Sequence, residues 1–271
     1  KMTEKDKLLE LRKLLSLNNI DSYFITSEDP HQSELVTPSE KKRAYISNFR
    51  GSCGTALVTQ NEALLWTDGR YWNEASKSLS SEWTLMRSGQ PGVLNLSQWL
   101  IQNFRGKKVG IDAFRVSTQF FQKLQKEVEG YDISIVIINE NLIDIVWGTE
   151  IPPFTVTPIY SHQLRFAGQT SESKINIIQS KLKASNTKLT VVSMLDEIAW
   201  LLNVRGLDIP LSPVIISYVI IPSEGPVHWF LPQYDTRTID PEVFENLRIN
   251  SDNPLVTLHP YEDVESFLIS S

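Results

Sequence analysis

The chain has 271 residues, which from length alone favours about two domains of roughly 100 to 150 residues each. Its apolar fraction of 41% and charged fraction of 21% are those of an ordinary globular protein with a substantial core, and they exclude disorder on a large scale. The 26 Lys and Arg against 32 Asp and Glu give a net charge of −6, which argues against a surface built for nucleic-acid phosphates or anionic lipid.

The features that report on the compartment agree with one another. No apolar run approaches the roughly 18 residues needed to cross a bilayer, and the charged start of the sequence, residues 1–5, is not followed by a signal-peptide core. The single cysteine, Cys53, cannot form an internal disulfide and fits a reducing environment. We therefore expect a cytoplasmic protein without nucleic-acid or membrane partners.

The first half of the chain shows alternating helix and strand patterns. The expected elements, in chain order, are an amphipathic helix carrying Leu8, Leu11, Leu14 and Leu15, a strand at 22–26, a short helix that begins at the capping pattern 37–40 and precedes Tyr45, strands at 55–59 and 63–66, a helix at 71–79, a strand at 83–86, a helix at 94–104, a strand at 109–112, a helix at 117–128 and a strand at 133–138. Residues 142–147 close this half. Ser117 is the expected N-cap of its helix, and the continuous apolar run 133–138 is typical of a strand buried on both faces. The alternation predicts an α/β fold, and the antiparallel hairpin at 55–66 makes its sheet mixed.

Residues 148–153 are the best candidate for a linker, because Pro152 and Pro153 interrupt both helices and strand ladders. The predicted domains are therefore residues 1–150 and 151–271. The elements expected in the second domain are a helix at 171–183, a strand at 189–193, a helix at 195–202, a strand hairpin within 214–231, a helix from 241, a strand at 255–258 and a helix at 261–268.

A short motif recurs in both halves. Residues 48–51 (Asn-Phe-Arg-Gly) are matched by residues 203–206 (Asn-Val-Arg-Gly) at an offset of 155 (203 − 48), and a strand, a turn and a strand follow in both places. Each second strand carries a tryptophan, Trp66 or Trp229. We interpret the pattern as duplication of one supersecondary unit, so the two hairpins should lie in separate sheets.

The residue types that usually hold metals are scattered. The four histidines are His31, His162, His228 and His259, and no two of them lie within five residues of each other. The sequence has no His-Glu-x-x-His motif, cysteine pair or carboxylate–histidine cluster with ligand spacing, so a metal site within this chain is not expected. Each histidine is interpreted as a surface or cap residue.

Cys53 lies between Gly51 and Gly54, where a tight turn can present a reactive side chain. The surrounding residues match neither the Gly-x-Ser-x-Gly nor the papain-like cysteine pattern, and no histidine can be paired with it. A buried or half-buried structural cysteine is therefore the favoured interpretation. The same glycines lack the Gly-Lys-Ser/Thr of a phosphate loop, so nucleotide binding has no support.

Charged residues near the repeated motif have structural explanations. Asp68 is interpreted as a turn residue, and Asp196 and Glu197 as favourable charges in the first turn of a helix. Arg50 and Arg205, at matching places in the repeat, either brace their own turns or place one guanidinium toward a ligand carboxylate. No catalytic residue is nominated.

A resemblance to a known family rests on three segments: RAYISNFRGSCGTA at 43–56, WTDGRY at 66–71 and LDEIAWLLNVRG at 195–206. They resemble the eukaryotic cytosolic three-domain Xaa-Pro aminopeptidases (aminopeptidase P). Pro213, Ser217 and Tyr218 fit the continuation of the third segment, and the likeness spans essentially the whole chain. Asn48 and Cys53 depart from the family, which commonly has small residues there.

The resemblance implies an α/β fold of two tandem mixed-sheet domains of the creatinase N-terminal type, with ribonuclease-H-like topology, followed by a third, catalytic domain. In that family the third domain holds two manganese ions on Asp, Asp, His, Glu and Glu and removes the N-terminal residue that precedes proline. This chain ends where the third domain should begin, so the resemblance implies no cofactor and no catalytic or metal-binding residue within it. It also implies proline-containing peptides as substrates of the full-length enzyme, and a homodimer formed through the catalytic domain.

With catalysis assigned elsewhere, these domains are expected to shape substrate access. Gly51 lets the backbone approach another surface, and Phe49 next to Arg50 offers an apolar wall with a carboxylate-binding fork. We predict that Phe49, Arg50 or Arg70 borders the mouth of the active-site cleft. Two alternatives are that the arginines only brace local turns, and that the chain is a stand-alone interaction module without peptidase activity.

Overall fold

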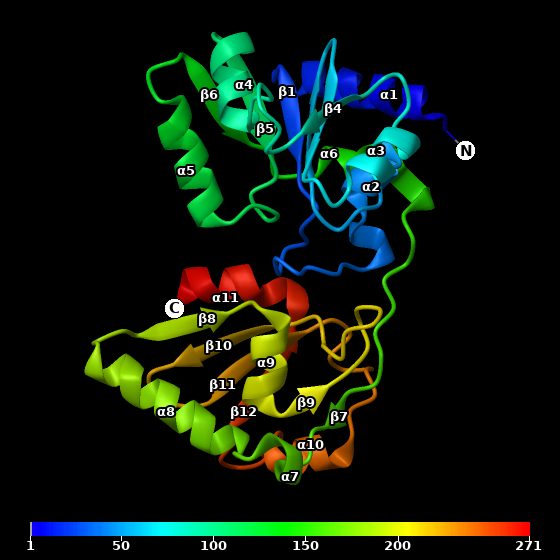
Figure 1. The fold of residues 1–271 in the computed structure, drawn as a ribbon. Helices are drawn as coiled ribbons and strands as arrows, with labels where there is room; N and C mark the ends of the chain where they lie inside the picture. The colour runs from blue at the N-terminus through cyan, green and yellow to red at the C-terminus, as the bar shows by residue number, and fades with distance from the viewer. Residues whose placement is uncertain (1) are drawn as a thin grey trace. The chain divides into compact units, whose positions relative to one another are not determined.

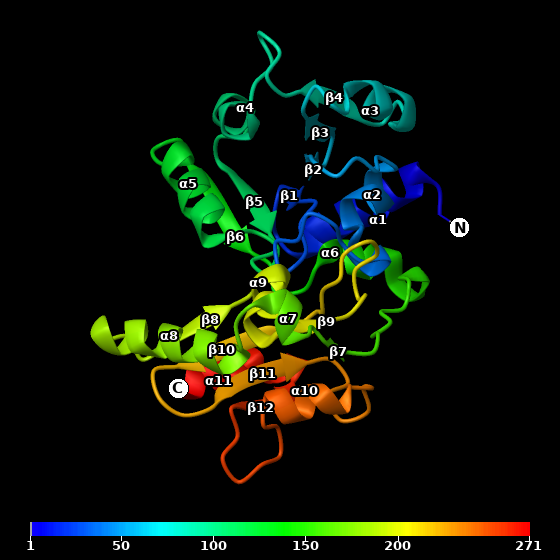
Figure 2. The ribbon, with the colours of Figure 1, turned by 60° about the horizontal axis from the view of Figure 1, so that its bottom comes forward.

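The computed structural model describes residues 2–271, which separate into two compact units: unit 1 extends to Pro153 and unit 2 begins at Phe154 (Figures 1 and 2). Each unit holds its own sheets and its own hydrophobic core. Within the described residues, no helix combines the length and the apolar composition needed to cross a bilayer.

Unit 1 is built on a mixed sheet of six strands in the order β4-β3-β2-β1-β5-β6. The strands are β1 (Ser22–Ile25), β2 (Thr55–Thr59), β3 (Ala63–Thr67), β4 (Thr84–Arg87), β5 (Lys107–Ile111) and β6 (Ile133–Ile137). Strand β2 pairs antiparallel with both β1 and β3, whereas the pairs β3–β4, β1–β5 and β5–β6 are parallel. The expected hairpin is therefore present as β2 and β3, and it makes the sheet mixed.

Helices cover both faces of this sheet. They are α1 (Glu4–Leu17), η1 (Pro38–Glu40), α2 (Lys42–Ser47), α3 (Trp72–Ser78), α4 (Leu96–Asn103), α5 (Thr118–Val128), α6 (Leu142–Trp147) and η2 (Gly148–Glu150). Helices α1, α2 and α6 bury residues such as Leu11 and Ile143 against one face, and α4 and α5 bury Trp99 and Leu124 against the other (Figure 1). Ser117 caps α5 as expected, because its side chain accepts from a backbone N–H of the first turn at 3.1 Å.

Two elements of unit 1 differ from the expectation. The run 133–138 forms β6, but β6 is an edge strand, and Ile137 is 53% exposed instead of buried. An apolar run alone does not distinguish an edge strand from a central one. The capping pattern at 37–40 begins only a 3₁₀ turn, and the α-helix then runs through Tyr45 to Ser47 instead of preceding Tyr45.

Unit 2 contains a four-stranded sheet in the order β12-β11-β10-β8 and a two-stranded sheet of β7 and β9. Its strands are β7 (Tyr160–Ser161), β8 (Leu189–Val192), β9 (Val204–Arg205), β10 (Tyr218–Pro222), β11 (Val227–Leu231) and β12 (Val256–Pro260). Its helices are α7 (Leu164–Ala167), α8 (Ser171–Ala184), α9 (Leu195–Leu202), α10 (Pro241–Asn246), η3 (Tyr261–Asp263) and α11 (Val264–Ser270). Helices α8, α9 and α10 pack on one face of the four-stranded sheet, and α11 lies on the other face (Figure 1).

The four-stranded sheet repeats the first four strands of unit 1. Strands β8, β10, β11 and β12 pair in the same order and directions as β1, β2, β3 and β4, and the two hairpins lie in separate sheets. Asn48 and Asn203 occupy the same place, since each ends a helix, α2 or α9, with a left-handed backbone (φ 57° and 51°). Strands β5 and β6 have no counterpart in residues 154–271. The recurring motif therefore marks a repeated arrangement of strands and helices.

The two tryptophans of the repeat do not occupy equivalent positions. Trp66 points to the face of its sheet covered by α4 and α5, where its ring centroid lies 6.5 Å from that of Trp99. Trp229 points to the face covered by α8 and α9, which correspond to α1 and α2 of unit 1. Because side chains alternate along a strand, a shift of one residue between the copies places the same residue type on opposite faces.

A buried ion pair ties the beginning of unit 2 to its core. Arg237 donates through Nη2 to both carboxylate oxygens of Asp208, at 2.7 and 2.9 Å, and both side chains are 0% exposed. Asp208 also accepts hydrogen bonds from the backbone N–H and hydroxyl of Thr157 and from the backbone N–H of Ile216. One carboxylate therefore connects the segment before β7, the segment before β10 and the segment after β11.

Candidate functional site

The turn at residues 48–54 joins α2 to β2, and Arg43 holds it from inside. Arg43 donates from Nη1 to the Gly54 carbonyl at 2.8 Å and from Nη2 to the Gly51 carbonyl, and its guanidinium lies 4.7 Å from the centre of the Phe49 ring. Burial lowers the pKa of Arg43 to about 10, so the group stays charged at neutral pH. Sequence reasoning missed this brace, because its acceptors are backbone carbonyls that no side-chain pattern reveals.

Phe49 is a core residue and does not form a surface wall. Its side chain is 0% exposed, and its ring packs edge-on against Tyr71 with 6.0 Å between the ring centroids. A glycine is required beside it, because a Cβ on Gly51 would lie 2.4 Å from Phe49 Cζ. In this conformation Phe49 cannot touch a peptide, and it acts on the turn that carries Arg50.

Arg50 projects into solvent from the same turn. Its side chain is exposed and makes no hydrogen bond or ion pair with any of residues 2–271. Arg205, at the matching position of the repeat, donates from Nη1 to the Ala199 carbonyl at 2.9 Å and to the Val204 carbonyl at 2.8 Å. Arg205 therefore braces the end of α9, whereas the guanidinium of Arg50 remains available to a partner.

Arg70 is engaged by Asp68. Its Nε and Nη2 atoms donate to the two carboxylate oxygens of Asp68 at 3.0 and 2.9 Å, and Asp68 also accepts from the backbone N–H of Arg70 at 3.0 Å. These hydrogen bonds hold the pKa of Asp68 well below its usual range. The interpretation of Asp68 as a turn residue is thus consistent with the geometry, and Arg70 is less available than Arg50 for binding a carboxylate.

Cys53 is exposed, so the expectation of a buried or half-buried side chain is wrong. Arg43 binds the carbonyl groups on the inner side of this turn, and the side chains of residues 52 and 53 point outward. Partial shielding by neighbours and a hydrogen bond with the Asp68 carboxylate raise the pKa of the thiol. A raised pKa leaves little thiolate at neutral pH, which does not favour Cys53 as a nucleophile.

The histidines are not all surface residues. His31 is only 3% exposed, in the loop that follows β1, and its backbone N–H donates to Asp29. His228 on β11 and His259 on β12 face each other, with Nδ1 of the first 3.0 Å from Nε2 of the second. Sequence reasoning missed this pair because the two residues are 31 positions apart, and only the parallel pairing of β11 with β12 brings them together.

Unit 1 also contains a polar cluster beside the C-terminal ends of β1 and β5, a place where open α/β sheets often bind ligands. Arg115 pairs with Glu40 at 2.5 Å and with Asp112 at 3.0 Å, and Lys42 pairs with Asp144. A hollow of about 200 Å³ adjoins Arg115. Each cation of the cluster already has a carboxylate partner, so the cluster stabilises this end of the sheet and offers no unpaired cation to an anionic ligand.

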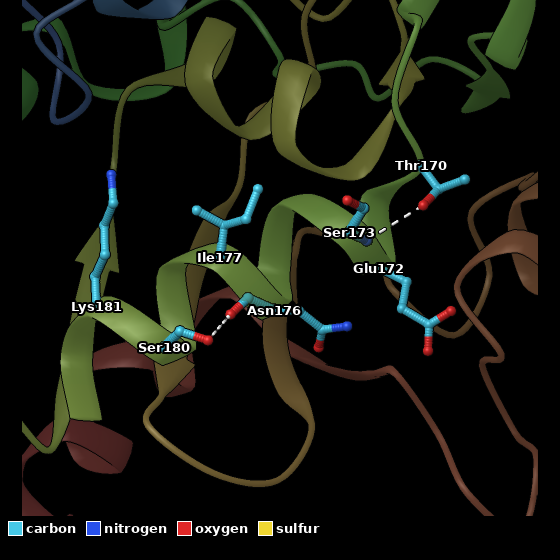
Figure 3. Close-up of a pocket in the computed structure, with 7 residues that line it drawn as sticks. All are labelled: Thr170, Glu172, Ser173, Asn176, Ile177, Ser180 and Lys181. Atoms are coloured by element: carbon cyan, nitrogen blue, oxygen red, sulfur yellow. Dashed lines mark hydrogen bonds between the residues drawn. The ribbon is translucent and has the colours of Figure 1, made fainter. Parts of the chain in front are cut away.

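A larger, open hollow of about 580 Å³ lies along the outer side of α8 (Figure 3). Its lining residues are Thr170, Glu172, Ser173, Asn176, Ile177, Ser180 and Lys181. Their polar contacts serve the helix itself, since the Ser173 backbone N–H donates to the Thr170 hydroxyl and the Ser180 hydroxyl donates to the Asn176 carbonyl. The side chains drawn in Figure 3 do not converge on a common point, so this hollow lacks the geometry of a catalytic site.

Across residues 2–271, no three His, Cys, Asp or Glu side chains come close enough together to hold a metal ion. The described residues therefore do not fit the two-metal centre that the resemblance implies for a catalytic domain, and no catalytic step is assigned to them.

Two family models cover most of the chain, each describing a creatinase/prolidase N-terminal domain, one over residues 7–140 and the other over residues 150–271. The chain belongs to the creatinase/prolidase N-terminal domain family. The predicted fold class, two tandem α/β domains of this type with mixed sheets, is confirmed.

Relatives of this creatinase/prolidase N-terminal chain are aminopeptidases. A probable Xaa-Pro aminopeptidase P of Pyrenophora teres f. teres and aminopeptidase P2 of Arabidopsis thaliana are each 38% identical to it over 97% of its length. The crystal structure of X-prolyl aminopeptidase from Caenorhabditis elegans, described as a cytosolic enzyme with a di-nuclear active site, matches 100% of the chain with a TM-score of 0.90 at 31% identity. The chain spans only 39%, 37% and 44% of these three proteins, respectively. The resemblance to the N-terminal domains of Xaa-Pro aminopeptidases is confirmed.

Proposed function

We propose that this chain is the non-catalytic N-terminal region of an Xaa-Pro aminopeptidase, an enzyme that releases the N-terminal residue preceding proline. The observation that carries the proposal is the extent of the match: relatives named for this activity align with 97% of the chain, while the chain spans less than two fifths of their length. A region that aligns in full but makes up a minority of each relative is expected to supply part of the enzyme and not its whole activity.

The peptide-bond chemistry is proposed to reside outside residues 2–271. The related nematode enzyme has a di-nuclear active site, and the described residues contain no cluster of side chains suited to a metal ion. We propose manganese as the metal of the complete enzyme, a cytoplasmic location, and a homodimer formed through the catalytic domain. All three follow from the family resemblance.

A peptidase assay tests the assignment. The 271-residue chain and the complete protein encoded by the same gene are each incubated with Mn²⁺ and an Arg-Pro-Pro peptide, and release of arginine is followed by mass spectrometry. We expect release by the complete protein only. Release of arginine by the 271-residue chain would overturn the assignment of catalysis to residues outside this chain. An encoded protein that ends near Ser271 would favour a stand-alone interaction module.

The proposed contribution of these domains is control of substrate access, with Arg50 as its principal residue. The support is geometric: Arg50 is exposed and unpaired among residues 2–271, Arg70 is held in a bidentate pair by Asp68, and Phe49 is buried behind the turn. A guanidinium with no partner within its own unit can bind a peptide carboxylate without first losing an ion pair.

Substitution of Arg50 in the complete enzyme tests this role. Arg50→Ala is expected to raise KM for peptides of three or more residues severalfold and to leave the unfolding temperature unchanged, because no hydrogen bond or ion pair within unit 1 is lost. Arg87→Ala, at another exposed arginine of unit 1, is the matched control and should leave KM unchanged. If Arg50→Ala lowers the unfolding temperature and leaves KM unaffected at every peptide length, Arg50 is structural and the access role is wrong.

A further inference from the structure

Three polar atoms meet on the face of the unit 2 sheet that α11 covers. His228 Nδ1 lies 3.0 Å from His259 Nε2, and the Thr257 hydroxyl oxygen lies 3.0 Å from the first nitrogen and 3.1 Å from the second. Strands β11 and β12 pair His228 with Thr257 and Phe230 with His259, so these four side chains share one face of the sheet. The three atoms form a nearly equilateral triangle in which each is within hydrogen-bond distance of the other two.

The direct hydrogen bond between the two rings exists only while one of the two facing nitrogens carries no hydrogen. With both rings neutral, one ring nitrogen donates to the other. The Thr257 hydroxyl can donate to the nitrogen that carries no hydrogen, or it can donate to the Val227 carbonyl at 3.4 Å and accept from the ring N–H. A first added proton can be shared between the two nitrogens in a charge-assisted hydrogen bond. A second added proton makes both facing nitrogens N–H donors 3.0 Å apart, which removes the hydrogen bond and sets two positive charges against each other.

The histidine pair is also the surface on which α11 rests. The Phe267 ring of α11 lies with its centroid 4.5 Å from that of His228, 5.6 Å from that of His259 and 5.4 Å from that of Phe230. The Phe230 ring stacks on His259 at 4.9 Å. Phe267 is the one aromatic residue of α11, and its ring contacts both histidines, so we take it as the residue through which the state of the two histidines acts on this helix.

Few charges near the pair can compensate two imidazolium groups. The acidic residues of η3 and α11 are Glu262, Asp263 and Glu265, all exposed, and of these only Asp263 acts appreciably on His259. Strand β10 contributes Tyr218, whose ring stacks on Tyr261 at 5.2 Å, and β8 contributes no ionisable side chain. Burial lowers the pKa of both histidines, and for His228 the neighbouring His259 lowers it further.

We propose that His228 and His259 form an acid-sensitive clasp, in which the neutral, hydrogen-bonded pair holds Phe267 and α11 on the sheet and double protonation releases them. The direction follows from proton linkage. When α11 is undocked, the two rings are uncovered and can turn apart into solvent, so they bind protons closer to the ordinary histidine value, whereas in the docked state they bind protons only at lower pH. Docking is therefore fully favourable above the ordinary histidine pKa of about 6.5, and it weakens as pH falls below that value.

Hydrogen exchange of the 271-residue chain tests the clasp. Amide exchange in α11 is measured by mass spectrometry from pH 8 to pH 5 and divided by the intrinsic rate at each pH, which gives the opening constant of the helix. That constant is expected to rise as pH falls, by up to about tenfold per pH unit for each proton taken up on opening and hence up to about 100-fold per unit for two. Helix α9, on the opposite face of the sheet, serves as the internal reference and should show no such rise.

Variants separate the clasp from a general effect of acid. In the double variant His228→Asn, His259→Gln, amide groups stand near the positions of Nδ1 and Nε2, so a hydrogen bond is retained without titration. Opening of α11 should then become independent of pH, while His162→Gln, a histidine outside the pair, should leave the dependence intact. A double variant that opens with the unchanged pH dependence would overturn the proposal, as would α9 opening in parallel with α11.

Imidazole NMR of the unsubstituted chain provides a test that does not depend on the variants folding. We expect the two rings to titrate in coupled steps below the ordinary histidine pKa, and the ring contacts of Phe267 to be lost as they do so. Independent titration near the ordinary value with α11 still docked would refute the clasp. The clasp would also be overturned if the chain binds Zn²⁺ stoichiometrically, if this binding is lost in His259→Gln, and if α11 stays docked only when Zn²⁺ is bound. The two histidines would then be metal ligands.

Discussion

The buried ion pair of unit 2 gives a quantitative test of how this domain is held together. We consider Asp208→Ala, which removes the carboxylate that pairs with Arg237 and accepts from Thr157 and Ile216. The substitution leaves a guanidinium with a 0% exposed side chain and no counter-ion. It also leaves backbone N–H groups without an acceptor, each of which costs free energy when buried.

The expected loss is large compared with the stability of a domain. Removing one partner of a buried ion pair costs about 3–5 kcal/mol, against a total of about 5–15 kcal/mol for an ordinary domain. An unfolding entropy of about 2.1 cal/mol/K per residue, summed over a unit of about 120 residues, converts this loss into a fall of roughly 12–20 °C in unfolding temperature. Differential scanning calorimetry is the assay, because it can resolve the transition of unit 2 from that of unit 1.

A second substitution shows whether the unpaired charge is the cause. Asp208→Ala combined with Arg237→Met removes the buried charge, so the double variant should be more stable than Asp208→Ala alone. Glu224→Ala breaks the exposed pair with Lys183 and should leave the transition unchanged. A loss below about 1 kcal/mol for Asp208→Ala, or a double variant less stable than the single one, would refute the reasoning.

Two further predictions concern the turn of unit 1. Gly51→Ala should destabilise unit 1 by about 1–3 kcal/mol through overpacking, because its Cβ would lie 2.4 Å from the buried Phe49 ring. Urea unfolding measures the loss, and Gly69→Ala is the control, because its Cβ would meet nothing nearer than 3.9 Å. Equal effects of the two substitutions would show that Gly51 is not sterically required. Cys53 should react slowly with iodoacetamide at pH 7, because its raised pKa reduces the thiolate fraction. Asp68→Asn removes the carboxylate that opposes ionisation and should speed alkylation severalfold, as measured by mass spectrometry, whereas an unchanged or slower rate would contradict the assigned cause.

Local patterns were enough to predict most of the elements of both units. The helix expected at 195–202 is α9 at the same bounds, and Ser117 caps α5 as predicted, because capping groups and apolar periodicity act over a few neighbouring residues. The repeated Asn-x-Arg-Gly also reported a real feature, since a left-handed asparagine ends the helix in both copies. The family resemblance rested on the same kind of contiguous information.

The functional details depended on contacts between residues far apart in the sequence. Arg50 and Arg205 have the same local sequence, yet only Arg205 braces its turn, by donating to the carbonyl groups of Ala199 and Val204. In unit 1 the turn is braced instead by the buried Arg43, which donates to the carbonyl groups of Gly51 and Gly54. Likewise, the apolar run of β6 became an edge strand, and Trp66 and Trp229 point to opposite faces, because strand order and register belong to the whole sheet.

What the sequence determined by itself was therefore most of the helices and strands, their duplication and the family. Only the tertiary structure decided which side chains lie in the core and which arginine is exposed for a partner. It also decided that His228 meets His259. The physical reason is that propensity, capping and alternation are properties of adjacent residues, whereas burial and ion pairing depend on which distant strand or helix comes to lie alongside.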